Sequence, residues 1–211
     1  MITYKVPSLK LEIGDHPIIY ADHEPESRVD KYESIFNFSD EPPYGINKKA
    51  HPETEVHRHP INEFGYWTYQ PFFFMVHLMD DAVARDRNVY VHCHAGAHRS
   101  PMMTYLYLRS LGNSPDEAYA LFDDKYVVLG EKSNWLEETF QNDVEYGRIP
   151  ADIVEFMKDV RKNKDISMMH VMKKRGGLDV SEKAKAKGSE KKPVGKEQLW
   201  QWKNGVFSKQ D

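Results

Sequence analysis

The chain has 211 residues, of which 40% are hydrophobic and 29% are charged, and its formal net charge at pH 7 is −4. This composition is typical of a globular protein, and the length suffices for one compact domain with a substantial core plus an appendage. No apolar run approaches the ~20 residues that cross a bilayer. The first residues lack the pattern of a secretory signal. A lone cysteine, Cys93, excludes an internal disulfide, so we expect a cytoplasmic protein.

The charge is unevenly distributed along the chain. Between residues 173 and 196, nine Lys and Arg face three Asp and Glu, a net charge of +6 that leaves −10 for the rest. This polar stretch predicts a disordered linker, and aromatic residues return only at 199–207. We therefore expect a domain over residues 1–163 and a basic tail over 164–211. The tail is most simply a solvated linker, but its lysines also allow contact with nucleic acid or an anionic membrane. The oligomeric state is not indicated.

Short β-branched and aromatic runs, bounded by Gly, Pro and Asp, predict strands in the first half of the chain. These strands are expected at residues 9–13, 17–21, 34–38 and 55–59. The Pro-rich and charged segment 40–53 is predicted to be a loop. Another short, buried strand is expected at 88–92.

Helical spacing dominates elsewhere. Apolar residues at i, i+4, i+7 and i+11, namely Phe72, Val76, Met79 and Val83, predict a helix facing the core. Asp80, on the same helix, is interpreted as a solvated charge. Capping and stop signals predict further helices: one ended by Gly112, one capped by Ser114, one capped by Ser133 and one over 150–163. The order of elements indicates an α/β protein, with early strands, a helix, a central strand and then helices.

The junction after the central strand carries unusual residues, in the sequence VHCHAGAHRSP at 91–101. A tight loop between a strand and a helix gathers backbone amides at the positive end of the helix, which creates an anion site. Gly96 supplies backbone freedom there, and Ala95 and Ala97 leave room for an oxyanion. Arg99 adds a planar guanidinium that can hold two phosphate oxygens at once.

Cys93 ends the strand beside this predicted anion site. The field that attracts phosphate also stabilises a thiolate. A thiolate next to a bound phosphate can attack phosphorus and form a phosphocysteine. The position therefore predicts a nucleophile, although a buried cysteine is in other settings a small core residue.

His92, Cys93, five further residues, Arg99 and Ser100 resemble the H-C-x5-R-[ST] signature of cysteine-dependent protein phosphatases. SIFNFSDE (34–41) and SNWLEETF (133–140) also look like segments of their compact dual-specificity subgroup, and the resemblance spans roughly residues 9–146. It implies a protein-tyrosine-phosphatase-like fold, with a central mixed, largely parallel sheet of four or five strands flanked by helices. It also implies hydrolysis of phosphomonoesters without metal or cofactor.

The resemblance assigns roles to matching residues. Cys93 would be the nucleophile, Arg99 the phosphate clamp and Ser100 a hydrogen-bond donor that helps the sulfur depart. His92 would be a structural support that orders the loop. The phosphate oxygens would be bound by backbone amides of the loop, those of His94, Ala95, Gly96, Ala97, His98 and Arg99.

The general acid departs from the family pattern. The family usually carries an aspartic acid on a loop upstream of the cysteine, but here that loop reads HPINEFGYW (59–67). Asn62 lies at the aligned position and cannot act as a carboxylic acid, which leaves it a supporting role. Glu63 is the first candidate for the acid and His59 the second, while a site without a dedicated acid would lose ~10²–10⁴ in rate.

The expected substrate is protein phosphotyrosine, with phosphoserine and phosphothreonine as further substrates in proteins. One alternative keeps the chemistry and changes the substrate to RNA 5′-triphosphate or another non-protein phosphate. Another is a catalytically weak module that binds phosphoproteins, which Asn62 favours. A metal site among the histidines is disfavoured, because His92 and Cys93, as neighbours on a strand, point to opposite faces.

Overall fold

A computed structural model of the chain describes residues 2–15, 31–40, 52–122, 134–163, 200–203 and 206–209. It divides into two compact units, Met1–Val171 and Met172–Asp211. The predicted strand at 17–21, most of the predicted loop at 40–53 and the predicted linker at 173–196 lie outside the described residues.

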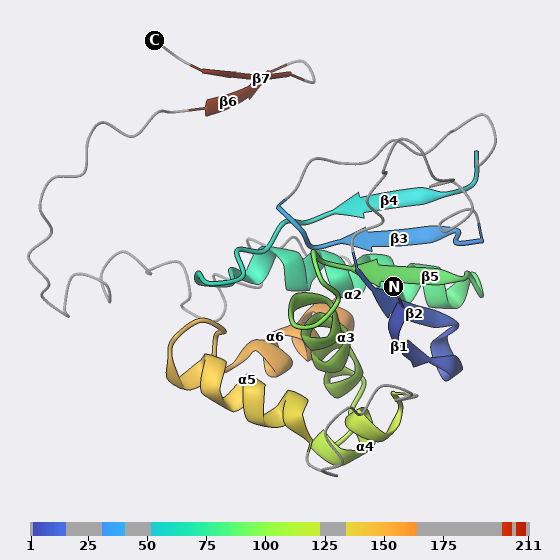
Figure 1. The fold of residues 1–211 in the computed structure, drawn as a ribbon, viewed down its shortest axis with the longest axis vertical. Coiled ribbons are helices and arrows are strands. Elements are labelled where there is room, and N and C mark those ends of the chain that lie inside the picture. The colour runs from blue at the N-terminus through green and yellow to red at the C-terminus, as the bar shows by residue number, and fades with distance from the viewer. Residues whose placement is uncertain are drawn as a thin grey trace, which may run out of the picture. The chain divides into compact units, whose positions relative to one another are not determined.

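Within the described part of the first unit, five strands form one sheet (Figure 1). They are β1 (Ile2–Val6), β2 (Leu11–Gly14), β3 (Ser34–Asn37), β4 (Glu55–Arg58) and β5 (Val89–His92). Their spatial order is β1-β2-β5-β3-β4. Only the β1–β2 pair among these is antiparallel, and β2, β5, β3 and β4 run parallel. The predicted mixed, largely parallel sheet is confirmed.

The first strands differ from the prediction. The chain forms β1, then a 3-10 turn over Pro7–Leu9, and only then β2, which begins at Leu11. Lys10 closes that turn in the left-handed region, with a φ of 47°. The expected strand at 9–13 was therefore placed too early, because Pro7 and Lys10 form a tight β1–β2 connection. The strands expected at 34–38, 55–59 and 88–92 agree with β3, β4 and β5 to within one residue at each end.

Five α-helices lie among the described residues, one before β5 and four after it. They are α2 (Tyr69–Ala84), α3 (Arg99–Ser110), α4 (Pro115–Ala120), α5 (Trp135–Glu145) and α6 (Ile153–Lys162). Helices α2, α3 and α6 pack against one another, α3 lies on β2 and β5, and α4 and α5 contact α3. Every residue of α3 from Arg99 to Leu108 is buried, so the helix that follows the 91–101 motif runs through the core (Figure 1).

The apolar stripe of α2 is confirmed at Phe72, Val76 and Met79, which are fully buried, whereas Val83 at its end is only half-buried. The interpretation of Asp80 was wrong. Its side chain is only 11% exposed, accepts a hydrogen bond of 2.8 Å from the Tyr107 hydroxyl and pairs with Arg161 at 3.1 Å. A charge on α2 therefore joins α3 and α6, and no local pattern could reveal these partners.

The helix caps agree in part with the sequence. Ser114 forms the predicted capping box with Glu117 at the start of α4. The predicted cap of α5 was wrong, because Asn134 rather than Ser133 is the N-cap and accepts a hydrogen bond of 3.1 Å from the amide of Glu137. Asn134 also donates to the carbonyl of Pro115 at 2.9 Å, which joins α5 to α4.

None of the helices within the described ranges has both the length and the hydrophobicity needed to cross a bilayer. In the second unit, β6 (Trp200–Lys203) pairs antiparallel with β7 (Val206–Lys209), with Trp202 opposite Phe207.

Candidate active site

The loop of residues 93–98 joins the C-terminal end of β5 to the first turn of α3 (Figure 1). Because β2, β5, β3 and β4 are parallel, the segments that follow them all emerge at this edge of the sheet. The N-terminal end of α3 carries the partial positive charge of the helix dipole. The position is therefore suited to an anion, as the sequence predicts.

Gly96 lets the 93–98 loop approach the neighbouring strand. It lies in the left-handed region, with a φ of +69°, and a Cβ there would lie 2.4 Å from the carbonyl carbon of Gly14 and 2.5 Å from its oxygen. These contacts are with backbone at the end of β2, which cannot move aside as a flexible side chain would. Position 96 therefore requires glycine for two reasons, the left-handed backbone conformation and the lack of space for a side chain.

Cys93 lies under this loop and is 2% exposed. The Ser100 hydroxyl donates a hydrogen bond of 3.3 Å to its sulfur, and such a donor stabilises negative charge on the acceptor. His92 is fully buried, with Nδ1 at 3.2 Å from the carbonyl oxygen of Cys93, so Nδ1 carries the proton in that contact. The ring of His92 also stacks on Tyr90, with centroids 5.5 Å apart.

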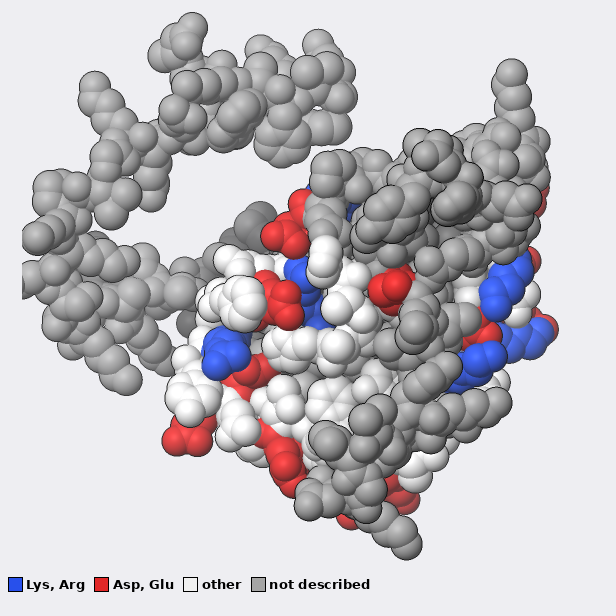
Figure 2. Space-filling model, viewed as in Figure 1, with Lys and Arg blue, Asp and Glu red and all other residues white. Residues whose placement is uncertain are grey.

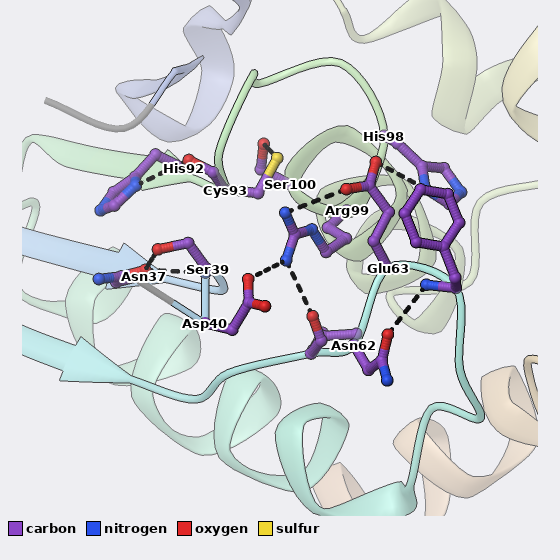
Figure 3. A network of polar contacts seen from close by, with 12 residues as sticks. Asn37, Ser39, Asp40, Asn62, Glu63, His92, Cys93, His98, Arg99 and Ser100 are labelled. Carbon is purple, nitrogen blue, oxygen red and sulfur yellow. Dashed lines mark hydrogen bonds and ion pairs between the residues drawn. The ribbon is translucent and has the colours of Figure 1, made fainter. Parts of the chain in front are cut away.

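The Arg99 guanidinium is the centre of the polar network in Figure 3. Its side chain is 3% exposed. Nη1 donates to Asp40 Oδ1 at 3.0 Å and to the Ile61 carbonyl at 2.9 Å, and Nη2 donates to Glu63 Oε2 at 3.2 Å. The buried Nε has no hydrogen-bond partner among the described residues. Nε and Nη2 form one edge of the guanidinium, the edge that two phosphate oxygens can occupy together.

Asp40 is a site residue that sequence reasoning missed. It follows β3, whose last residue Asn37 is aligned with His92 of β5, and its side chain is 74% exposed. The hydrogen bond from Arg99 lowers the pKa of Asp40 below its usual value. The available signal was that β3 and β5 are parallel neighbours, because the residues after both strands must then lie at the same edge of the sheet.

The loop after β4 directs Glu63, and not Asn62, toward Arg99 (Figure 3). The side chain of Glu63 is 38% exposed, and its Oε1 lies 4.0 Å from Nδ1 of His98. Asn62 instead accepts a hydrogen bond of 3.1 Å from the amide of Phe64, which orders the turn of the loop.

His59, the second candidate for the acid, lies against helix α2. Its ring stacks on Phe74, with centroids 4.4 Å apart. Burial, with a smaller contribution from the neighbouring His57, lowers the pKa of His59 to about 4. It is therefore neutral near pH 7 and holds no imidazolium proton to donate.

The remaining residues of the 93–98 loop differ in exposure. His94, Ala95 and Ala97 are exposed, whereas His98 is half-buried. Nε2 of His98 lies 3.2 Å from Oδ2 of Asp143 on α5, a contact that sequence reasoning also missed.

On the face shown in Figure 2, acidic and basic side chains adjoin one another among uncharged residues. Across the described ranges, no group of three or more His, Cys, Asp or Glu side chains is placed to hold a metal ion.

No protein-family model matches the chain, and no curated protein matches it. Several solved structures are similar to it. Tk-PTP in its active form is 18% identical, with a TM-score of 0.47 over 64% of this chain and 91% of that one. PTPMT1 in complex with PI(5)P is 18% identical, with a TM-score of 0.44 over 76% and 96% of the two chains. Kinase associated phosphatase with its catalytic site cysteine replaced by serine is 13% identical, with a TM-score of 0.45 over 80% and 97%.

Proposed function

We propose that this chain is a cysteine-dependent phosphatase that hydrolyses phosphomonoesters through a phosphocysteine at Cys93. The observation that carries the proposal is one junction of strand, loop and helix that brings together the Cys93 sulfur, the Ser100 hydroxyl and the Arg99 guanidinium. Each of these groups is buried, and the loop between them closes against β2 at Gly96. A nucleophile, a donor to that nucleophile and a phosphate-binding cation are the groups that the reaction needs.

Binding would begin at Arg99. A phosphate dianion accepts hydrogen bonds from Nε and Nη2 together, and this bidentate geometry is among the strongest that arginine makes. Among the described residues, Nε has no hydrogen-bond partner and Nη2 donates to Glu63. The dianion therefore takes the place of Glu63 at Nη2, while Asp40 and the Ile61 carbonyl continue to hold Nη1.

The first chemical step transfers the phosphoryl group to sulfur. The Cys93 thiolate attacks phosphorus, a bond between sulfur and phosphorus forms, and the bond from phosphorus to the leaving oxygen breaks. Glu63, displaced from Arg99 and carrying a proton in the productive complex, gives that proton to the leaving oxygen, which departs as an alcohol or a phenol. In the second step, water attacks phosphorus and passes a proton to the Glu63 carboxylate. The sulfur leaves as a thiolate that accepts a hydrogen bond from Ser100, and inorganic phosphate is released.

The assignment of Glu63 as the acid rests on its position. It lies on the loop after β4 at hydrogen-bond distance from Arg99, whereas Asn62 on the same loop bonds to the loop backbone. A general acid contributes ~10²–10⁴ to the rate, and more for poor leaving groups. We expect Glu63→Gln to slow alkyl phosphates by about that factor, and to leave aryl phosphates with good leaving groups nearly unchanged. Asp40→Asn, tested beside it, should preserve this difference between leaving groups, because Asp40 holds the opposite nitrogen of Arg99.

For the substrate, we propose phosphotyrosine in proteins, with phosphoserine and phosphothreonine as further substrates, in a cytoplasmic setting. RNA 5′-triphosphate is the second candidate, supported by the net charge of +6 over residues 173–196 of the sequence. Lysines in such a stretch attract a nucleic acid whatever its sequence. Phosphate release from a phosphotyrosyl peptide, compared with release from triphosphate-ended RNA, separates the two.

The experiment that tests the proposal uses the full chain and the variants Cys93→Ser and Arg99→Ala. Cys93→Ser should abolish turnover and keep phosphopeptide binding, because the loop and Arg99 remain. Arg99→Ala should weaken binding and turnover together. Turnover that persists in Cys93→Ser would refute the nucleophile. Phosphopeptide binding by the wild type, with no turnover that depends on Cys93, would show instead the binding module that Asn62 favours.

A further inference from the structure

His98 lies between two carboxylates at the start of α3. Its Nε2 is 3.2 Å from Oδ2 of Asp143, and its Nδ1 is 4.0 Å from Oε1 of Glu63. The side chain of His98 is 22% exposed, and that of Asp143 is 3% exposed. The imidazole therefore connects a buried carboxylate on α5 with the residue that we propose as the general acid.

Asp143 is fixed by contacts on both of its carboxylate oxygens. Oδ2 faces His98, and Oδ1 pairs with Nη1 of Arg148 at 3.1 Å. Its backbone carbonyl accepts hydrogen bonds from the amides of Arg148 and Ile149, at 2.7 and 3.1 Å. A buried carboxylate is tolerated when its oxygens have such partners, and this one has little freedom to move.

A fixed carboxylate determines the tautomer of the imidazole. An ionised carboxylate only accepts hydrogen bonds, so Nε2 of His98 must carry the proton in this contact. In the neutral ring, Nδ1 then presents its lone pair toward Glu63. When the ring is protonated, Nδ1 presents an N–H in the same direction. Either form can bind Glu63, the neutral ring its carboxylic acid and the imidazolium its carboxylate.

Two further groups lie beside the His98 ring, and neither comes between its Nδ1 and Glu63. The Trp67 ring lies beside it, with centroids 5.6 Å apart. The next residue, Arg99, bonds to the other oxygen of Glu63. Glu63 thus has Arg99 as its hydrogen-bonded partner and His98 as a neighbour 4.0 Å away, and the phosphate dianion competes for Arg99 alone. When the dianion occupies Arg99, His98 is the partner that remains.

We propose that Asp143 is a positioning residue that acts on the general acid through His98. It holds the imidazole with Nδ1 toward Glu63, and the imidazole keeps the Glu63 carboxyl at the site when phosphate displaces it from Arg99. The inference rests on the proposed function, because it gives Glu63 the role of proton donor. In this proposal Asp143 acts only through His98, so its effect must depend on the same leaving-group chemistry as that of Glu63.

The test compares two substrates, an alkyl phosphate and an aryl phosphate with a good leaving group, in the variants Asp143→Asn and His98→Ala. Misplacement of the acid should lower kcat for the alkyl phosphate about tenfold, a part of the ~10²–10⁴ that a general acid contributes. Activity on the aryl phosphate should fall less than about twofold, since that leaving group needs little protonation. Glu137→Gln is the matched control, because Glu137 is also a carboxylate of α5, paired with Arg109 at 2.6 Å. It should leave the ratio of the two rates unchanged.

The decisive readout is the pair of double variants in the Glu63→Gln background. If Asp143 acts through Glu63, then adding Asp143→Asn or His98→Ala costs nothing further on the alkyl phosphate. The inference would be overturned if the rate losses of the two substitutions in a double variant multiply, or if Asp143→Asn slows both substrates equally. Asp143 would then be a purely structural residue. Asp143→Asn keeps the volume of the side chain, and His98→Ala gives an independent answer if Asp143→Asn fails to fold. Wild-type turnover that does not depend on Cys93 would overturn the proposed function as well, whereas multiplicative effects with Cys93-dependent turnover would overturn this inference alone.

Discussion

Replacing Gly96 by alanine should disable the site while leaving the fold intact. The new Cβ would lie 2.4 to 2.7 Å from three backbone atoms, the carbonyl carbon and oxygen of Gly14 and the amide nitrogen of Asp15. Ordinary contacts of this kind are about 3.5 Å or longer, so the loop must retreat from β2 by roughly 1 Å. A displacement of about 1 Å between reacting groups can cost ~10²-fold in rate.

Gly147→Ala is a matched control for the backbone conformation. Gly147 has a φ of +68°, almost the same as the +69° of Gly96, but a Cβ there would meet nothing within 4 Å. Both variants should lose about 1–2 kcal/mol of unfolding free energy, because alanine is strained in the left-handed region. Only Gly96→Ala carries the additional clash with β2.

The assay is kcat/KM for an aryl phosphate, together with the unfolding free energy from denaturant titration. We expect Gly147→Ala to keep kcat/KM within about twofold of the wild type, and Gly96→Ala to lose about 100-fold. Activity of Gly96→Ala close to that of Gly147→Ala would refute the reasoning, because it would mean that the 93–98 loop does not depend on its contact with β2.

Three further predictions concern single side chains. Ser100→Ala removes the donor to the Cys93 sulfur and should slow phosphocysteine hydrolysis about tenfold or more, which appears as a larger burst relative to steady-state turnover; an unchanged burst would contradict the role. For Glu12, burial alone would raise the pKa, but hydrogen bonds from Lys31, Lys5 and Tyr32 lower it to about 2. The ionised Glu12 carboxylate therefore stabilises the fold fully above pH 4.5, the usual pKa of the group, and this stabilisation is lost as the pH falls through 2. Glu12→Gln should lower the unfolding free energy at pH 6 by up to about 3 kcal/mol. Denaturant titrations should show that the difference between wild type and variant vanishes toward pH 2, and a difference that stays constant with pH would contradict the role of the Glu12 carboxylate. Asp80→Asn should lower the unfolding free energy by about 3 kcal/mol, because it leaves Arg161 without its buried partner. The half-exposed Asp81 serves as the control, and Asp81→Asn should lower the unfolding free energy by about 0.5 kcal/mol or less.

Local sequence signals predicted the elements that depend on nearby residues. The β-branched run before Cys93, the glycine within the loop and the proline in the first turn of α3 placed the strand, loop and helix correctly. The capping box at Ser114 was equally local. Such signals act within a few residues of the chain, so they appear in the sequence in full.

Contacts between distant residues could not be predicted in the same way. Asp40 is 59 residues from Arg99, and Asp143 is 45 residues from His98, so no spacing rule joins either pair. Asp40 could have been inferred from strand adjacency, since its strand β3 is parallel to β5. Asp143 had no comparable signal, because a carboxylate on an amphipathic helix normally faces solvent.

The central claim is that Cys93 carries the phosphoryl group during turnover. Its most direct test is to mix the wild-type chain with an aryl phosphate, quench in acid within one turnover, and map the phosphorylated peptide by mass spectrometry. The claim predicts one phosphoryl group on Cys93, and more of it in Ser100→Ala, where hydrolysis of the intermediate is slower. Rapid turnover with no phosphate on Cys93, or with phosphate on another residue, would contradict it.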